Sequence, residues 1–298
     1  FFASTSSLTF LSASIAAGFL MSRVIIRDIT SENEAASMIG YVTMGMSIIP
    51  LFAPGLGGLI QMLLGWPSIF LIMSLLGLLL LLLVFRDLGE TKIIKKNKNT
   101  KSSASFINLF WEAKFWGYSF TLAFSAGTFF SFLGGAPYVA TKVYNLNSVV
   151  SGLVMGFPAA GYFIGNYLSG RYSKFYGIDY MALRGILLVI FGMFICLVIT
   201  VFYRDTPYFF FGLCSFVGLG NGLIIPNASV GILSVNENLS GTAGGIGNAI
   251  MIGTGAILAS LTSYYLENQT SSSYLVFIML LSGALSYTCL YIFVLRNK

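Results

Sequence analysis

The chain has 298 residues, of which 56% are hydrophobic and only 9% are charged. In a soluble domain roughly a quarter of the residues are charged. One water-soluble core could not bury this much apolar surface, so we expect the chain to lie in a lipid bilayer. The net charge of +6 is compatible with a nucleic-acid partner, whereas the lack of histidine removes the commonest metal ligand and the commonest general base.

Nine predicted membrane-spanning helices account for most of the chain. A spanning segment must satisfy its own backbone hydrogen bonds, which leaves helices of about 20 apolar residues or closed barrels. Unbroken apolar runs such as residues 69–85 lack the alternation of a barrel strand, so we predict an all-α integral membrane protein. The predicted spans are residues 5–24, 37–61, 67–85, 115–136, 149–170, 180–203, 208–233, 243–266 and 273–295.

A polar stretch, residues 87–114, separates three of these spans from the other six. Its five lysines between residues 92 and 101 stand among Asn, Thr and Ser, which is typical of a solvated linker. The loops place every Lys and Arg except Lys142 and Arg204 on the linker's side of the membrane, so the positive-inside rule makes that side cytoplasmic. The basic charge therefore orients the chain without a nucleic-acid partner, and the C-terminus is predicted to be cytoplasmic.

The position of the linker predicts three parts, namely a partial N-terminal bundle (1–86), the basic cytoplasmic linker (87–114) and a C-terminal six-helix bundle (115–298). Many transporters join two six-helix halves, each containing three-helix repeats, through a cytoplasmic loop. Three spans before the linker correspond to half of one such bundle, and the chain begins at Phe1 close to the start of a span. We therefore expect about three N-terminal spans to be absent, through truncation, a split gene or fragmentation.

Proline and small residues gather in the second predicted span. A proline frees a backbone carbonyl and bends a membrane helix, and glycines let a neighbouring helix approach closely, so the pattern alone favours a kinked structural helix. The segment also resembles the antiporter signature of the major facilitator superfamily, with an alanine in place of the glycine before the second proline. The residues concerned are Gly45, Pro50, Ala53, Pro54, Gly57 and Gly58.

Further segments resemble the bicyclomycin-resistance-type drug:proton antiporters of that superfamily. Residues 21–28 resemble the end of their fourth span, residues 127–138 their seventh, and residues 222–228 with 241–243 their tenth span and the loop after it. These segments occur in the family's order along nearly the whole chain. The resemblance implies two helical bundles that rock by alternating access, as a monomer in the bacterial inner membrane, whose partners are a small-molecule substrate, protons and the lipid bilayer, with no cofactor.

The resemblance also draws attention to residues at the predicted cytoplasmic ends of spans. Arg23, Arg27 and Asp28 close the fourth-span segment. Gly170 and Arg171 begin a run, ending at residue 177, that resembles a degenerate copy of the superfamily's cytoplasmic loop signature. A plain positive-inside loop is an alternative interpretation, and the two are compatible.

Aromatic and amide residues within the spans are candidates for lining a substrate cavity. Aromatic faces and a few amides would accept flat apolar molecules, whereas helix packing with amides bonded across helices is the alternative, and for any single residue the favoured one. Asn221 and Asn248 are the strongest of the set, because an amide deep in hydrocarbon needs a partner or a water-filled cavity. The candidates are Phe129, Phe130, Tyr162, Asn166, Asn221 and Asn248.

No residue of the chain is a convincing proton carrier. All ten carboxylates lie in loops or at span ends, whereas a membrane-embedded ionisable residue is the usual sign of a proton relay. The family's acidic coupling residue lies in its first span, and Leu8 and Leu11 stand where its fourth span has an Arg-x-x-Gln pair. We therefore expect the proton carrier in the absent helices.

Three functions remain open on this evidence. Proton-driven export of small lipophilic drugs is the leading hypothesis, and the antiporter-like segment disfavours the second, which is the same fold carrying a metabolite or sugar. The third is a degenerate fragment with no independent transport. An enzyme is the least expected class, because neither metal ligands nor acid–base groups cluster in the sequence.

Overall fold

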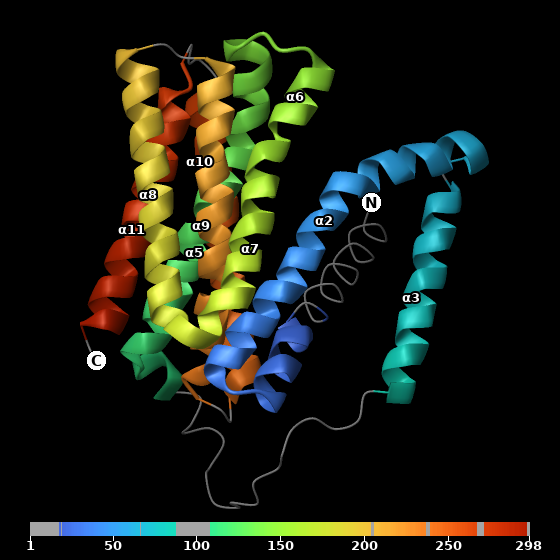
Figure 1. Cartoon of the computed structure of the whole chain (residues 1–298), viewed down its shortest axis with the longest axis vertical. Coiled ribbons are helices and arrows are strands. Elements are labelled where there is room, and N and C mark those ends of the chain that lie inside the picture. Colours follow the sequence, from blue (N-terminus) through green and yellow to red (C-terminus); the bar gives the residue numbers. More distant parts are fainter. Residues whose placement is uncertain are drawn as a thin grey trace, which may run out of the picture.

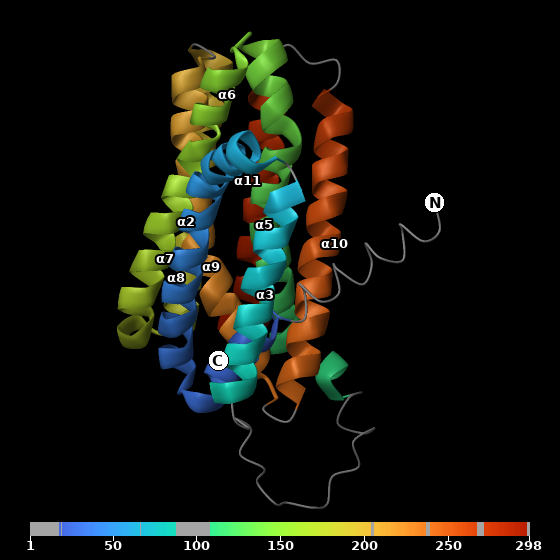
Figure 2. The ribbon, with the colours of Figure 1, turned by 90° about the vertical axis from the view of Figure 1, so that its right-hand side faces the viewer.

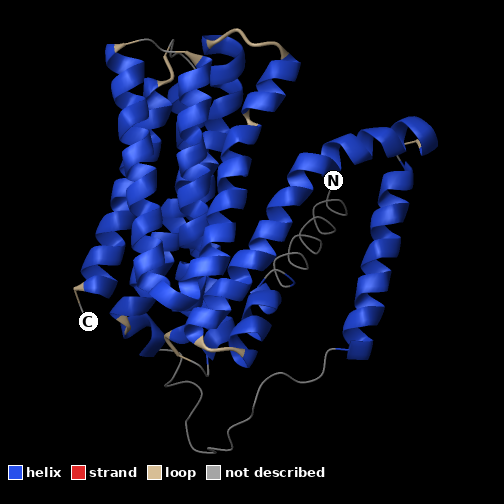
Figure 3. Ribbon diagram, in the orientation of Figure 1, coloured by secondary structure: helices blue, strands red, loops and turns tan. Residues whose placement is uncertain are grey.

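The computed structural model describes residues 18, 20–65, 67–87, 108–203, 206–236, 239–266 and 271–296, and helices are the regular structure of these residues (Figure 3). Leu8, Leu11 and the linker lysines lie outside the described residues. A helical segment over residues 20–29 comes first. It is followed by α2 (Glu32–Leu64), α3 (Pro67–Asp87), α5 (Ala113–Tyr138), the π-helical turn η1 (Val139–Val143), α6 (Ser148–Val154), α7 (Gly156–Tyr176), α8 (Ile178–Phe202), α9 (Pro207–Ser234), α10 (Ser240–Leu266), α11 (Ser273–Leu290) and a second π-helical turn, η3 (Tyr291–Leu295).

The predicted membrane helices agree with this architecture. Within the described residues, six helices are long and apolar enough to cross a bilayer, and all six lie at predicted spans. Helices α2 and α7 occupy two further predicted spans, while the predicted span 5–24 falls mostly outside the description. Helix α7 is more polar than these six helices. Its polar residues Asn166, Ser169 and Ser173 are buried, so they point at neighbouring helices. A multi-pass, all-α membrane protein is confirmed.

Helices α5 and α7 to α11 form one upright bundle (Figures 1 and 2). Glycines bring α7 and α9 into backbone contact, since a Cβ atom added at Gly161 would lie 2.1 Å from the Ser215 carbonyl oxygen, and one at Gly218 would lie 1.8 Å from that of Pro158. Lipid tails are as apolar as leucine side chains, so helices in a membrane associate through such close packing. The glycines therefore fix the centre of this six-helix bundle.

Helix α2 belongs to the bundle at one end only. Its first half lies against α7 and α9, and its second half bends away towards α3, which stands apart from the bundle (Figure 1). The helix continues unbroken through Pro50 and Pro54, and proline is a usual cause of such a bend. Gly65 follows with φ +80°, a left-handed conformation that favours glycine, and turns the chain into α3. No residue of the most apolar stretch of α3 is buried in the structure.

Candidate functional site

The first half of α2 touches α7 so closely that backbone meets backbone. A Cβ atom added at Gly40 would lie 2.6 Å from the amide nitrogen of Gly170, and one added at Gly170 would lie 2.8 Å from the ring of Tyr41. The Ser37 hydroxyl donates a hydrogen bond to the Gly170 carbonyl. We call the contact of residues 20–64 with α7, α9 and α10 the junction, and Gly170, predicted to belong to a loop motif, lies at its closest point.

An amide hydrogen bond continues the junction one turn further along α2. The Thr43 hydroxyl donates to Asn166 Oδ1 at 2.5 Å, and Asn166 Nδ2 donates to the Tyr162 carbonyl at 2.8 Å. Asn166 is fully buried, and both polar atoms of its amide are bonded. The structure thus places two of the predicted cavity residues, Tyr162 and Asn166, side by side on α7, with the Asn166 amide engaged in holding α2.

Two arginines before α2 extend the junction to α9. Arg23 Nη1 donates to Ser229 Oγ and Arg27 Nε donates to Ser234 Oγ, each at 2.8 Å. Arg23 is only 4% exposed, and a guanidinium removed from water needs such hydrogen bonds to offset its desolvation. The sequence indicated a basic cytoplasmic end at these positions, and the structure turns Arg23 inwards.

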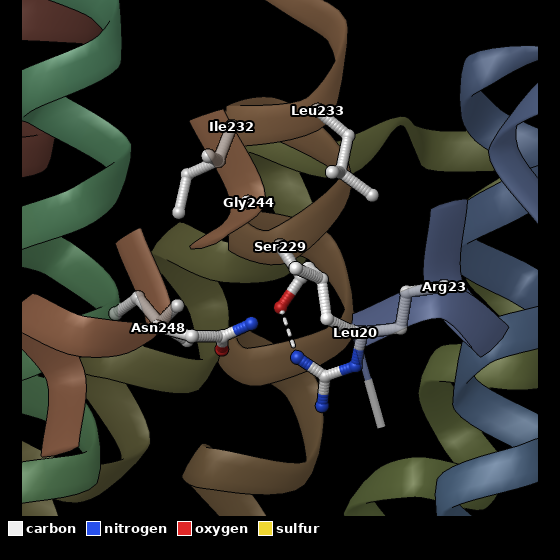
Figure 4. A pocket seen from close by; sticks show the side chains of 8 residues that line it. Leu20, Arg23, Ser229, Ile232, Leu233, Gly244 and Asn248 are labelled. Atoms are coloured by element: carbon white, nitrogen blue, oxygen red, sulfur yellow. Dashed lines mark hydrogen bonds between the residues drawn. The ribbon is translucent and has the colours of Figure 1, made fainter. Parts of the chain in front are cut away.

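A small pocket that holds three polar side chains lies where Arg23 meets the bundle (Figure 4). Asn248 approaches from α10 and points towards Ser229 and Arg23, while Leu20 and Leu233 are among its apolar lining residues. The volume is about 10 Å³, which is close to what one water molecule needs. Asn248 Oδ1 is buried and has no hydrogen-bond partner among the described residues. Asn248 therefore carries a free acceptor at the junction, unlike Asn166.

The third predicted amide, Asn221, lies within the bundle and away from α2. Asn221 on α9 accepts a hydrogen bond from the Ser125 hydroxyl of α5, and its Nδ2 donates to Thr128 Oγ1 at 3.2 Å. Asn221 is 1% exposed and both ends of its amide are engaged. This geometry is that of an amide bonding two helices together.

The two predicted phenylalanines pack against other parts of the bundle. The ring of Phe129 stacks on Phe132 with centroids 6.4 Å apart, and Phe130 lies against Gly255 of α10, where an added Cβ atom would come within 2.3 Å of its ring. Among the six predicted cavity residues, Asn248 is the one that lines the pocket of Figure 4.

The antiporter-type motif lies in the part of α2 that continues away from the junction. Gly45 is exposed, and a Cβ atom added there would meet nothing within 4 Å. The rest of the motif, Pro50, Ala53, Pro54, Gly57 and Gly58, is helical, and its side chains lie outside the described part of the structure.

Charged residues frame the end of the junction. Lys174 Nζ of α7 lies 2.9 Å from Glu34 Oε1 of α2, and hydrogen bonds from Lys174 and Ser31 hold the pKa of the Glu34 carboxyl below its ordinary value. Arg171 is exposed and donates to the Tyr167 hydroxyl at 3.0 Å, while Asp28 is partly exposed.

The hydroxyl partners at the junction were not predicted from the sequence. Ser37, Thr43, Ser229 and Ser234 are ordinary serines and threonines in long apolar stretches, with no spacing that distinguishes them from surface hydroxyls. Their only signal is a polar group within a predicted span, which in hydrocarbon needs an internal partner.

The fold and this junction define a multi-pass helical membrane protein in which two groups of helices meet through polar and glycine contacts at one end. Residues 1–260 match the family model of the Major Facilitator Superfamily, and the chain belongs to that family. The family consists of membrane transporters, which sets the chain apart from enzymes.

Three relatives illustrate the similarity. The chain is 29% identical over 255 residues to a bicyclomycin resistance protein homolog of Haemophilus influenzae, covering 83% of the chain and 63% of the relative. It is 26% identical over 299 residues to Multidrug resistance protein D of Escherichia coli, covering 96% and 73%. An uncharacterized MFS-type transporter of Bacillus subtilis, YdgK, is 27% identical over 165 residues, covering 53% and 40%. The chain thus spans less than two thirds of the length of two of these relatives.

Proposed function

We propose that the chain acts in proton-driven export of small lipophilic drugs across a bacterial inner membrane. Two relatives that match most of the chain are named for bicyclomycin resistance and multidrug resistance, which supports this class of cargo. In this proposal two helix groups, residues 1–86 and 115–298, rock against each other around a central site and are joined by a cytoplasmic linker at 87–114.

The junction is the observation that carries the proposal. The contacts given above come from the first half of α2 and the arginines before it, at the end of the bundle where the C-terminus lies, and α2 leaves the bundle at the other end (Figure 1). The positive-inside rule assigns the junction end to the cytoplasm. This arrangement supports a transporter that is closed on its cytoplasmic side, in which breaking the junction would open the alternate path.

The remaining roles follow from the same proposal. The protein works as a monomer with its C-terminus in the cytoplasm, and the proton carrier lies outside the spans of this chain. Phe129, Phe130 and Tyr162 offer aromatic faces to the cargo, and Asn248 offers the free acceptor at the junction. The motif from Gly45 to Gly58 allows α2 to bend during the rocking motion.

Drug-sensitivity and efflux measurements test the proposal. The chain is expressed from its own gene, together with any in-frame sequence upstream of Phe1, in a drug-sensitive bacterial host. We expect raised resistance to several lipophilic drugs and an ethidium efflux that stops when an uncoupler collapses the proton gradient. Unchanged sensitivity would contradict drug export, and efflux that continues with the uncoupler would contradict proton coupling.

Competition separates drug export from transport of a metabolite or sugar. Unrelated lipophilic compounds should each slow ethidium efflux, because aromatic and apolar surfaces accept many flat molecules. Inhibition by one sugar or metabolite and by none of these compounds would favour the other cargo class.

A further inference from the structure

An arginine and three tyrosines form a continuous stack at the turn between α7 and α8. The rings of Tyr172 and Tyr176 have centroids 6.2 Å apart, and those of Tyr176 and Tyr180 are 5.3 Å apart and nearly parallel. The Arg184 guanidinium carbon lies 5.0 Å from the Tyr180 ring centroid, within the range of a cation–π contact. All four side chains are exposed, so the stack presents a fixed positive charge to the surroundings.

An apolar groove begins at the same arginine and follows the outer face of α8. It has a volume of about 570 Å³ and is lined by Arg184, Leu187, Leu188, Ile190, Phe191 and Phe194. Phe191 meets Phe216 of α9 edge to face with centroids 6.5 Å apart. The groove is therefore apolar along its length and cationic at one end.

The dimensions of the groove match one leaflet of a bilayer. Arg184 is six residues into α8, about 9 Å along the helix axis from its start at the predicted cytoplasmic end. From Arg184 to Phe194 is about 15 Å at the same rise per residue, which is half of a hydrocarbon core of about 30 Å. The guanidinium thus lies at headgroup depth when the apolar residues lie at acyl-chain depth.

We propose that this groove is a binding site for an anionic phospholipid of the cytoplasmic leaflet. The phosphate of the headgroup pairs with Arg184, held by Tyr180, and one acyl chain lies along Leu187, Leu188 and Phe191. Basic residues on the cytoplasmic side of membrane helices attract anionic headgroups in this way, whereas in a zwitterionic headgroup a positive group offsets the charge of the phosphate.

The nearest acidic residue on α8 does not compete for Arg184. Asp179 accepts a hydrogen bond from the Tyr118 hydroxyl of α5 at 2.6 Å, so its carboxylate is engaged towards the bundle. Glu32, Asn33 and Asp179 line a separate hollow together with Tyr176 and Tyr180. No acidic residue is among the described residues that line the groove.

Native mass spectrometry of the whole chain in detergent tests the site. The protein is titrated with phosphatidylglycerol and, separately, with phosphatidylcholine of the same acyl chains. We expect tighter binding of phosphatidylglycerol, a roughly fivefold loss of that binding in Arg184→Gln, since one basic residue near an anionic lipid surface contributes about that factor, and near-native binding in Arg184→Lys. Lys142→Gln, which removes an exposed cation at the predicted opposite face, is the matched control and should bind as the native chain does.

Two further arms distinguish a lipid from its headgroup and guard against a folding defect. An excess of free glycerol 3-phosphate should leave the bound lipid in place, and Phe191→Ala should weaken both lipids because it shortens the apolar lining without changing the charge. Equal binding of the two lipids, an unchanged preference in Arg184→Gln, an equal loss in Lys142→Gln, displacement by glycerol 3-phosphate or unchanged binding in Phe191→Ala would each overturn the site.

Discussion

Thr43 and Asn166 lie 123 residues apart in the sequence and share a buried hydrogen bond between α2 and α7. Thr43→Val keeps the shape of the side chain and removes the donor, which leaves Asn166 Oδ1 without this partner. We expect the free energy of unfolding to fall by about 0.5–2 kcal/mol, as for other polar contacts between membrane helices. Reversible unfolding in detergent measures it.

Thr288→Val is the matched control for that experiment. Thr288 is exposed, and its hydroxyl donates a hydrogen bond to the carbonyl of Leu285 on its own helix, so its loss should change the stability little. An equal loss in the two variants would mean that the hydrogen bond across the junction adds nothing specific.

Asn221 and Asn248 should respond oppositely to the same substitution. Asn221→Leu leaves Ser125 and Thr128 without their amide partner. We therefore expect the free energy of unfolding to fall by about 1–3 kcal/mol, and the Tm to fall with it. Asn248→Leu removes an acceptor that has no partner and should leave the Tm unchanged or raise it. In the proposed function Asn248→Leu nevertheless lowers drug efflux. A stabilised Asn248→Leu variant with full efflux would remove Asn248 from the cargo site.

At the scale of the helix, two glycines of α2 test which of its parts is held by the bundle. Gly40→Ala would bring a Cβ atom to 2.6 Å from a backbone nitrogen of α7, so α2 and α7 must separate, and overpacking of this kind costs about 1–3 kcal/mol. Gly45→Ala meets open space five residues later and should not reduce the thermal stability. Equal Tm values for the two variants would contradict the close contact at Gly170.

Glycine also explains how the helices α7 and α8 join beside the proposed lipid site. Gly177 has φ +82°, a conformation that residues with a side chain rarely adopt. The chain therefore reverses in one residue, and the tyrosines on its two sides come close enough to stack. Neither the spacing of the tyrosines nor their number predicts that contact.

At the scale of the whole molecule, Glu34 and Lys174 link the two helix groups by an ion pair whose strength depends on pH. The pKa of Glu34 is lowered in the folded state, chiefly through its hydrogen bond with Lys174, so the pair stabilises the junction at pH values above the ordinary carboxyl pKa of about 4.3. This stabilisation is lost as the pH falls through the lowered value. Between pH 6 and 8 the contribution should stay constant.

Unfolding of the native chain and of Glu34→Gln at a series of pH values measures this contribution. The difference between the two proteins should be small, because the pair is partly exposed, constant near neutral pH and absent in strong acid. A difference that grows as the pH falls from 8 to 6 would contradict the assignment and would make this pair a candidate for the coupling step.

The sequence by itself determined the class of the protein and the places of its helices. Apolar stretches of some 20 residues must be helices in lipid whatever surrounds them, so the six described membrane helices were predictable from local composition. The motifs and their order along the chain likewise indicated the family, and the match over residues 1–260 confirmed it.

Only the tertiary structure decided what each polar residue does. Asn166, Asn221 and Asn248 are the same amide in similar apolar surroundings along the chain, and they differ only in the helix that faces them. Arg23 became an interior residue because Ser229, 206 residues away, lies opposite its guanidinium. Which side chains meet across a helix junction depends on how the helices are arranged in space, and local composition does not determine that arrangement.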